Sequence, residues 1–178
     1  DWAEELYTDV ANQYAYKKSV GEEALDKAED AYKQLSPVLR QNTSYRLRVS
    51  GTLLGLVVYS GRNDYPTTIG FCEKEIAFFK AKSYQANLPL QLLYQQLVVC
   101  YTQLRQYDRA GQAAEEGLNY LVVGSFNWFK HQEQRFLLYM HTEQYQAAYE
   151  LWEQTTGERS FRRAPEQLTE MWLVFQAY

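Results

Sequence analysis

A pair of tyrosines separated by five residues occurs three times in this chain of 178 residues. The three copies are Tyr59 with Tyr65, Tyr101 with Tyr107, and Tyr139 with Tyr145. Their first tyrosines are 42 and 38 residues apart, and nine residues after each lies a small side chain, namely Thr68, Ala110 or Ala148. Self-similarity at a nearly fixed period indicates a repeat architecture, so a chain of this kind is expected to fold as a series of similar units.

Each tyrosine pair brackets an expected turn between two helices. The clearest copy lies within residues 90–121. Its apolar residues follow the spacing of one helical face and are Tyr94, Leu97, Val98 and Tyr101, and Ala110 lies on the expected second helix. We therefore predict an antiparallel helical hairpin for each copy.

Apolar periodicity predicts about nine helices along the chain. The expected ranges are 1–18, 22–35, 44–60, 66–82, 86–105, 107–121, 126–141, 144–155 and 165–178. Ser36 and Pro37 are expected to end the second helix, because proline disfavours the helical conformation of the residue before it. The valines of residues 49–59 would also suit a strand, but their helical spacing to Tyr59 favours a helix.

This pattern resembles the tetratricopeptide repeat, a helix-turn-helix unit with an aromatic, a leucine and a small residue before a tyrosine, followed by an alanine. The resemblance implies an all-α, right-handed α-α superhelix of antiparallel hairpins in a single domain, residues 1–178. Its approximate units are 1–37, 43–84, 88–122 and 126–157, with an unpaired helix at 165–178. The period exceeds the ~34 residues of the family. Bulky residues also occupy the position where the family favours glycine, namely Leu56, Val98, Phe136 and Phe175.

Composition excludes several function classes. Eighteen basic and twenty-two acidic residues give a net charge of −4, which does not favour nucleic acid or anionic lipid as a partner. The longest apolar run falls far short of the roughly 20 residues that a membrane-spanning helix needs. Cys72 and Cys100 lie in apolar helical patterns and are expected to be buried and free. A cytoplasmic location is the default, although the compartment stays open.

The search for a catalytic or metal site finds no motif. His131 and His141 are ten residues apart and are expected to be solvated or to face a partner. No histidine stands at metal-ligand spacing to a cysteine, and no glycine-rich phosphate loop occurs. The carboxylates expected on exposed helix faces are Glu73, Glu75, Glu115 and Glu116. Arg159, Arg162 and Arg163 form a basic cluster, expected to be solvated rather than to grip an anion. We predict no enzymatic activity, no cofactor and no metal.

Stacks of tetratricopeptide-like hairpins bind peptides along a concave face formed by the first helix of each hairpin, and the resemblance implies a binding face here. The candidate residues are Gln95, Val99, Thr102, Lys130, Glu133, Leu137 and Met140. They do not reproduce the lysine and asparagine set with which the family grips a terminal carboxylate. A protein or peptide segment, preferably an amphipathic helix, is therefore the expected partner.

Two other functions stay open at this stage. One is a ligand-sensing regulatory module cut from a larger signalling or transcription regulator. The other is an enzyme whose site lies in the groove, with Glu133 and His141 as the first candidates. The helix at 165–178 is apolar on nearly all sides, which favours either an interrupted repeat or a homodimer contact over a polar cap.

Overall fold

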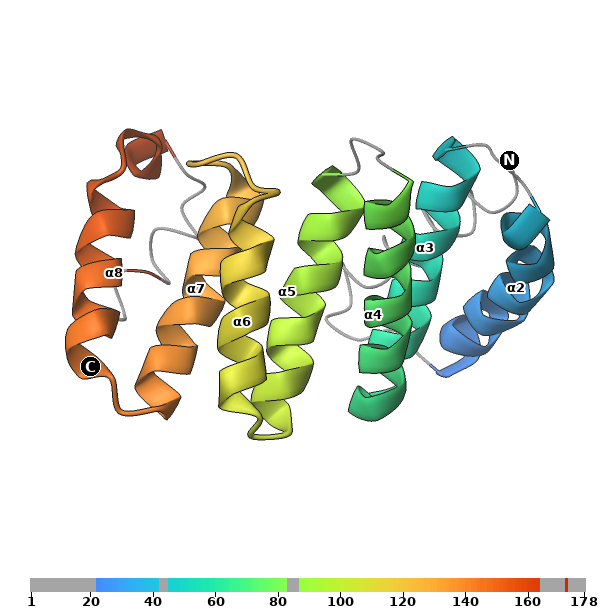
Figure 1. Ribbon diagram of the computed structural model, residues 1–178, viewed down its shortest axis with the longest axis horizontal. Helices are drawn as coiled ribbons and strands as arrows, with labels where there is room; N and C mark the ends of the chain where they lie inside the picture. The colour runs from blue at the N-terminus through green and yellow to red at the C-terminus, as the bar shows by residue number, and fades with distance from the viewer. Residues whose placement is uncertain (1–21, 42–44, 83–86, 164–171, 173–178) are drawn as a thin grey trace. The chain divides into compact units, whose positions relative to one another are not determined.

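The computed structural model describes residues 22–41, 45–82, 87–163 and Trp172 (Figure 1). Within these ranges all regular secondary structure is helical, with no strand, so the all-α prediction is confirmed. The described residues belong to two compact units, one ending before Gln85 and one beginning there. The predicted helices at 1–18 and 165–178 lie outside the described residues, apart from Trp172. That both units belong to one domain stays a prediction.

The first unit consists of three helices, α2 (Glu22–Gln41), α3 (Tyr45–Gly61) and α4 (Tyr65–Ala81). Helix α3 packs against both of the others. Its apolar side meets small residues of α2, and the buried cluster consists of Ala28, Ala31, Leu54 and Val58. Helix α3 is therefore covered on more than one side. Pro66 lies in the first turn of α4, where its missing N–H leaves no helical bond unmade.

The predicted helix end at Ser36 and Pro37 is wrong. Helix α2 contains Pro37 and continues to Gln41. Proline removes only the one intrahelical bond that its nitrogen would donate, and the residues beyond it keep their own bonds. A proline therefore disfavours helix locally without ending it wherever the following residues still favour the helical conformation.

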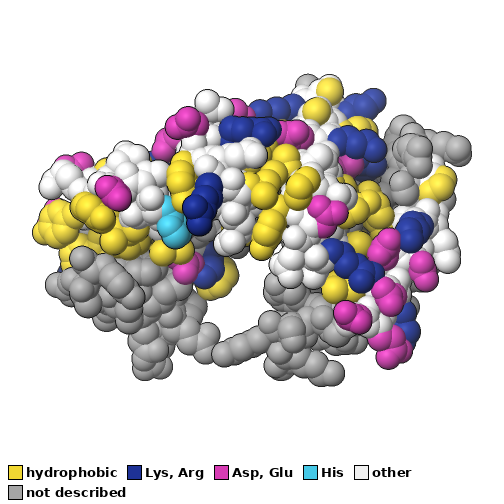
Figure 2. Space-filling view, turned by 90° about the horizontal axis from the view of Figure 1, so that it is seen from below, with side chains coloured by type: hydrophobic (Ala, Val, Ile, Leu, Met, Phe, Trp, Pro, Cys, Tyr) yellow, Lys and Arg dark blue, Asp and Glu magenta, His cyan; other side chains and the backbone are white. Residues whose placement is uncertain are grey.

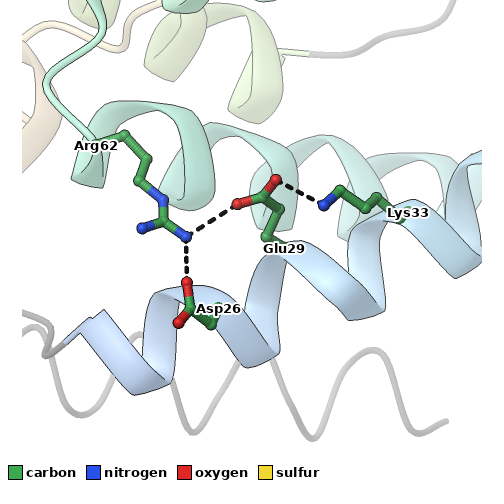
Figure 3. Close-up of polar contacts among 4 residues, drawn as sticks. All are labelled: Asp26, Glu29, Lys33 and Arg62. Atoms are coloured by element: carbon green, nitrogen blue, oxygen red, sulfur yellow. Dashed lines mark hydrogen bonds and ion pairs between the residues drawn. The ribbon is translucent and has the colours of Figure 1, made fainter.

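A network of charged side chains joins α2 to the turn between α3 and α4 (Figure 3). Arg62 Nη2 in this turn lies 2.5 Å from Asp26 Oδ1 and 2.9 Å from Glu29 Oε2. Glu29 also pairs with Lys33 one turn along α2, at 2.9 Å. The network is exposed, so it positions α2 more than it stabilises the unit.

The second unit consists of α5 (Asn87–Gln103), α6 (Tyr107–Leu118), α7 (Phe126–His141), α8 (Tyr145–Gly157) and the 3₁₀ turn η1 (Arg159–Arg163). Each α-helix packs against the next, and α5 also contacts α7. Most of the buried core around α7 and α8 is aromatic, and its members are Trp128, Phe129, Phe136, Ala148, Leu151, Phe161 and Trp172. The segment expected to be a loop after α8 thus forms η1 and adds Phe161 to this core.

The three predicted turns share one backbone geometry. In each, a non-glycine residue adopts the left-handed conformation: Asn63 with φ 55°, Arg105 with φ 57° and Glu143 with φ 60°. The N–H of each donates to the carbonyl three residues earlier, at 3.3, 3.0 and 3.2 Å in turn. A single left-handed residue is a common way to end a helix, and here it reverses the chain direction. The hairpin prediction is confirmed for all three tyrosine pairs.

The small residue after each turn is buried as predicted. Thr68, Ala110 and Ala148 are 1%, 0% and 2% exposed. The N–H of each donates to the carbonyl of the residue just before its helix, at 2.9, 3.0 and 3.0 Å. These positions are therefore equivalent in all three hairpins, and each lets the second helix approach its neighbours closely.

The rings of the first tyrosines have different neighbours. Tyr59 packs on Tyr32 and Phe71, with ring centroids 5.9 and 4.9 Å away. Tyr101 lies beneath the guanidinium of Arg109, which is 4.3 Å from its ring centroid. Tyr139 packs on the aromatic core of the second unit. The three repeats thus have the same backbone geometry at the turn, but their first tyrosines pack against different kinds of side chain.

Candidate functional site

The seven residues predicted to bind a partner lie on two helices of the second unit. We call this set the α5–α7 face; its members are Gln95, Val99 and Thr102 on α5, and Lys130, Glu133, Leu137 and Met140 on α7. Leu137 is exposed and the other six are half-buried. The two helices contact each other within the second unit.

Polar contacts fix the two helices at this face. The Gln95 amide Nε2 donates to the Asn127 carbonyl at 2.9 Å, which ties α5 to the first turn of α7. Lys130 and Glu133 form an ion pair one turn apart on α7. All three of the charged or amide groups are thus engaged within the chain, and the charges of Lys130 and Glu133 cancel.

Three members of the face are apolar. Leu137 is 39% exposed, and Val99 and Met140 are half-buried. Met140 also packs on the aromatic core from its other side. Methionine and branched aliphatic side chains accept apolar groups of varied shape. The Lys130 ammonium is already paired with Glu133, so it offers little to an anionic ligand. The chemistry of the face therefore fits an apolar ligand surface.

His131 holds α7 against α6. Its side chain is fully buried, so the prediction that it is solvated is wrong. Ring Nε2 lies 2.7 Å from the Ala114 carbonyl, which can only accept, so Nε2 carries the proton and donates. Ring Nδ1 has no hydrogen-bond partner among the described residues. Burial, reinforced by Arg135, lowers the pKa of His131, while the Ala114 bond and Glu115 oppose that shift.

Gly117 makes room for this histidine. A Cβ atom at Gly117 would lie 2.7 Å from His131 Cε1 and 3.0 Å from Tyr94 Cβ. The ring therefore sits where only a glycine on α6 allows it. The other predicted candidate, His141, is exposed and stacks on Tyr107, with ring centroids 6.2 Å apart. Glu133, the other groove candidate, is half-buried and forms an ion pair with Lys130.

Comparisons of the chain with family models, with curated proteins and with solved structures find no match.

Glu75 is buried, which corrects the prediction that it lies on an exposed helix face. Its carboxylate accepts bonds from Arg48 Nη2, at 2.6 and 2.7 Å, and from the Thr52 hydroxyl at 2.6 Å. The Arg48 guanidinium also lies 4.0 Å from the centroid of the Phe78 ring. The other three carboxylates of that prediction, Glu73, Glu115 and Glu116, are exposed. Because both oxygens of Glu75 are bonded within the unit, the pair joins α3 to α4 and leaves no oxygen turned to solvent.

Cys72 and Cys100 are buried, as predicted, and are not joined to each other in a disulfide. Burial raises the pKa of the Cys100 thiol, which disfavours the reactive thiolate. The part of the chain that the structure describes contains no cluster of three or more His, Cys, Asp or Glu side chains suited to a metal ion. Arg159 and Arg162 of the basic cluster are exposed on η1. Across the described ranges, every helix is too short or too polar to cross a bilayer.

An exposed aromatic row on α8 was missed by the sequence analysis. Tyr145 and Tyr149 are 59% and 53% exposed, and Tyr149 stacks on the half-buried Trp152. The signal was present, since these three residues follow the i, i+4, i+7 spacing of one helical face. The first of them entered the sequence analysis only as the second tyrosine of a pair.

Proposed function

We propose that this protein binds a segment of another protein on the α5–α7 face and carries out no reaction there. In this proposal the hairpins stack as a right-handed α-α superhelix of the tetratricopeptide type, and the first helices of successive hairpins line its inner side. The ligand is an amphipathic segment that places apolar side chains against Val99, Leu137 and Met140.

The observation that carries the proposal is the equivalence of the three hairpin turns. The same left-handed residue, the same turn hydrogen bond and the same buried small residue recur at each. Repeat units of this kind cannot bury their apolar sides alone and are stable by stacking on their neighbours. Such stacks present extended surfaces made of corresponding helices, which here are α5 and α7.

The chemistry of the face supports an apolar, helical ligand. Its one ion pair is internal, and the Gln95 amide is already bonded to the Asn127 carbonyl. A ligand recognised by its charge would find few groups to bind. A helix that lays its apolar side into a groove needs only spaced aliphatic contacts, and the face supplies them.

The test is selection of peptides by the purified protein from a displayed library, followed by calorimetry with the selected peptides. We expect enriched sequences with apolar residues at helical spacing. Leu137→Asp should weaken their binding by about tenfold or more, as expected for an apolar contact at the centre of an interface. The control is Val122→Asp, because Val122 is 72% exposed in the α6–α7 loop and outside the face.

Two results would contradict the proposal. One is a library selection that enriches no sequence over an unrelated helical protein. The other is a set of selected peptides that bind the Leu137→Asp protein as tightly as the unaltered one. Leu137 is exposed, so its replacement is expected to leave the helix content unchanged, which circular dichroism checks.

A further inference from the structure

The exposed aromatic residues of α8 form one continuous row. Tyr145, Tyr149 and Trp152 follow each other at helical spacing, and we call them the α8 aromatic row. The Tyr149 and Trp152 rings stack with centroids 6.1 Å apart, and the Tyr149 hydroxyl donates to Glu153 at 2.8 Å. These contacts hold the Tyr149 ring in place before any partner arrives. An ordered aromatic side chain gives broad contact area at low entropic cost.

The corresponding row of residues on α6 shows which kind of element packs against such a row. Helices α6 and α8 both begin at the second tyrosine of a pair, after equivalent turns. The α6 residues at the three equivalent positions are Tyr107, Gly111 and Ala114.

Helix α7 covers this α6 row along its length. His141 stacks on Tyr107 with ring centroids 6.2 Å apart, and Leu138 lies 3.9 Å from the Cβ position of Gly111. His131 bonds to the Ala114 carbonyl at 2.7 Å. The occupant of the row on α6 is therefore a helix, in contact at all three positions.

On α8 the coverage is partial. Trp152 Nε1 donates to the Trp172 carbonyl at 2.9 Å, and Trp172 itself is fully buried. The other two members of the row remain more than half exposed. The uncovered part is the N-terminal half of α8, around Tyr145 and Tyr149.

The charged side chains of α8 itself are of one sign, and the arginines of η1 follow its C-terminal end. Helix α8 contains Glu150 and Glu153 and no lysine or arginine, and Glu143 lies in the turn before it. Figure 2 shows hydrophobic side chains gathered over α8. An apolar row with acidic neighbours matches a helix whose apolar side is flanked by basic residues. A second copy of this same row would instead bring like charges together.

We propose that the α8 aromatic row docks an amphipathic, basic helix of a partner protein, with Tyr145 and Tyr149 as its main contacts. This surface is separate from the α5–α7 face. It extends the pairing seen between α6 and α7 to a helix supplied from outside the chain.

The experiment measures binding of two synthetic peptides to the full chain by calorimetry. Both are helical peptides of about 18 residues with a leucine row, long enough to hold helical structure. One flanks its row with lysines, and the matched control places glutamates at the same positions. We expect the lysine peptide to bind at least about tenfold more tightly than the glutamate peptide.

Two variants of the full chain complete the test. The double variant Tyr145→Ser and Tyr149→Ser should weaken binding of the lysine peptide by at least about tenfold, because it removes the aromatic contacts. Leu137→Asp removes binding of the leucine row to the α5–α7 face, so the part of the affinity that this variant keeps and the double variant loses belongs to the α8 aromatic row. Failure here is thereby distinguishable from failure of the first proposed site. Both tyrosines are exposed, so the double variant is expected to fold, and circular dichroism checks this.

Three results would overturn the inference. The lysine peptide could bind the double variant as well as the unaltered chain, or the two peptides could bind equally. Sedimentation equilibrium could also show a dimer of the chain that the double variant loses, which would make a second copy the occupant of the row. A fourth result, that neither peptide binds the chain, would overturn the inference as well.

Discussion

The two units of this protein use the same hairpin backbone but join their helices with different chemistry. In residues 22–82 the contacts between helices include a buried ion pair of Arg48 with Glu75 and an exposed charged network around Arg62. In the second unit the core is mostly aromatic, and the buried polar group at the α6–α7 contact is a neutral histidine. Figure 2 shows the same contrast at the surface, with charged side chains gathered over α2 and hydrophobic ones over α8.

The comparison shows which features the hairpins of both units share and which differ between the units. The turn needs one left-handed residue and a buried small side chain, and both units supply them. The contact between helices needs only that volume is filled and polar groups are paired. The units should therefore respond differently to pH, to salt and to loss of a single partner, even though their turns are equivalent.

The largest effect is expected from removing one member of the buried ion pair. Glu75→Ala leaves the Arg48 guanidinium buried without its carboxylate, and breaking such a pair costs about 3–5 kcal/mol. Amide hydrogen exchange resolved by mass spectrometry should show loss of protection in α3 and α4. Glu73→Ala, an exposed neighbour on the same helix, is the control and should leave exchange unchanged. A similar small response to both changes would mean that the pair does not hold the first unit together.

In the second unit the largest loss of stability should come from adding a side-chain atom next to the buried ring of His131. Gly117→Ala places a methyl group 2.7 Å from His131 Cε1 and 3.0 Å from Tyr94 Cβ, and overpacking of this kind costs about 1–3 kcal/mol. The matched change Gly111→Ala meets its nearest neighbour, Leu138 Cδ2, at 3.9 Å, an ordinary contact. It should stabilise the helix by up to about 1 kcal/mol. Urea unfolding followed by tryptophan fluorescence measures both, and equal signs would contradict the geometry.

The same histidine should make the second unit sensitive to acid. Burial lowers the pKa of His131 below its ordinary value of 6.5, so the unfolded chain binds more protons than the folded one as the pH falls through that value. The free energy of unfolding should therefore decrease below pH 6.5, by at most about 1.4 kcal/mol per pH unit for one proton.

The only two histidines of the chain provide the control for this pH dependence. His131→Gln keeps an amide donor for the Ala114 carbonyl but cannot titrate, so this part of the slope should disappear. His141→Gln, at an exposed position, should retain it. Fluorescence-detected unfolding between pH 5.5 and pH 7.5 separates the two variants, and an unchanged slope in His131→Gln would exclude the buried ring as the cause.

The sequence predicted what local spacing determines. The range expected for α7, residues 126–141, is the observed one, and each tyrosine pair brackets a turn because turn geometry depends on a few adjacent residues. Contacts between distant residues were not predictable in the same way. Glu75 looked like any exposed helix carboxylate because its partner Arg48 lies 27 residues earlier. The burial of His131 depends on Gly117, which leaves space for the imidazole ring. A single glycine within a helical pattern does not indicate which side chain packs against it.

The candidate binding residues illustrate the same limit. Sequence spacing and the family resemblance placed them on α5 and α7, and these helices do lie in contact. Nothing in the sequence indicated that the Gln95 amide is bonded to the Asn127 carbonyl, and the spacing of Tyr145 and Tyr149 on α8 did not indicate that their common face is exposed. Both facts depend on which helix lies beside which, and hydrophobic periodicity identifies a face without identifying its neighbour.

The smallest effect is expected at the exposed network of the first unit. Arg62→Gln removes the bonds to Asp26 and Glu29 shown in Figure 3, and exposed pairs of this kind contribute about 0.2–1 kcal/mol each. The loss should shrink at 1 M salt, where charges on the surface are screened within about 3 Å. Glu75→Ala should lose nearly the same stability at both salt concentrations, because its pair with Arg48 is buried. Exchange of the α2 amides at low and high salt tests this contrast, and a salt-independent Arg62 effect would place that side chain in the same class as Arg48.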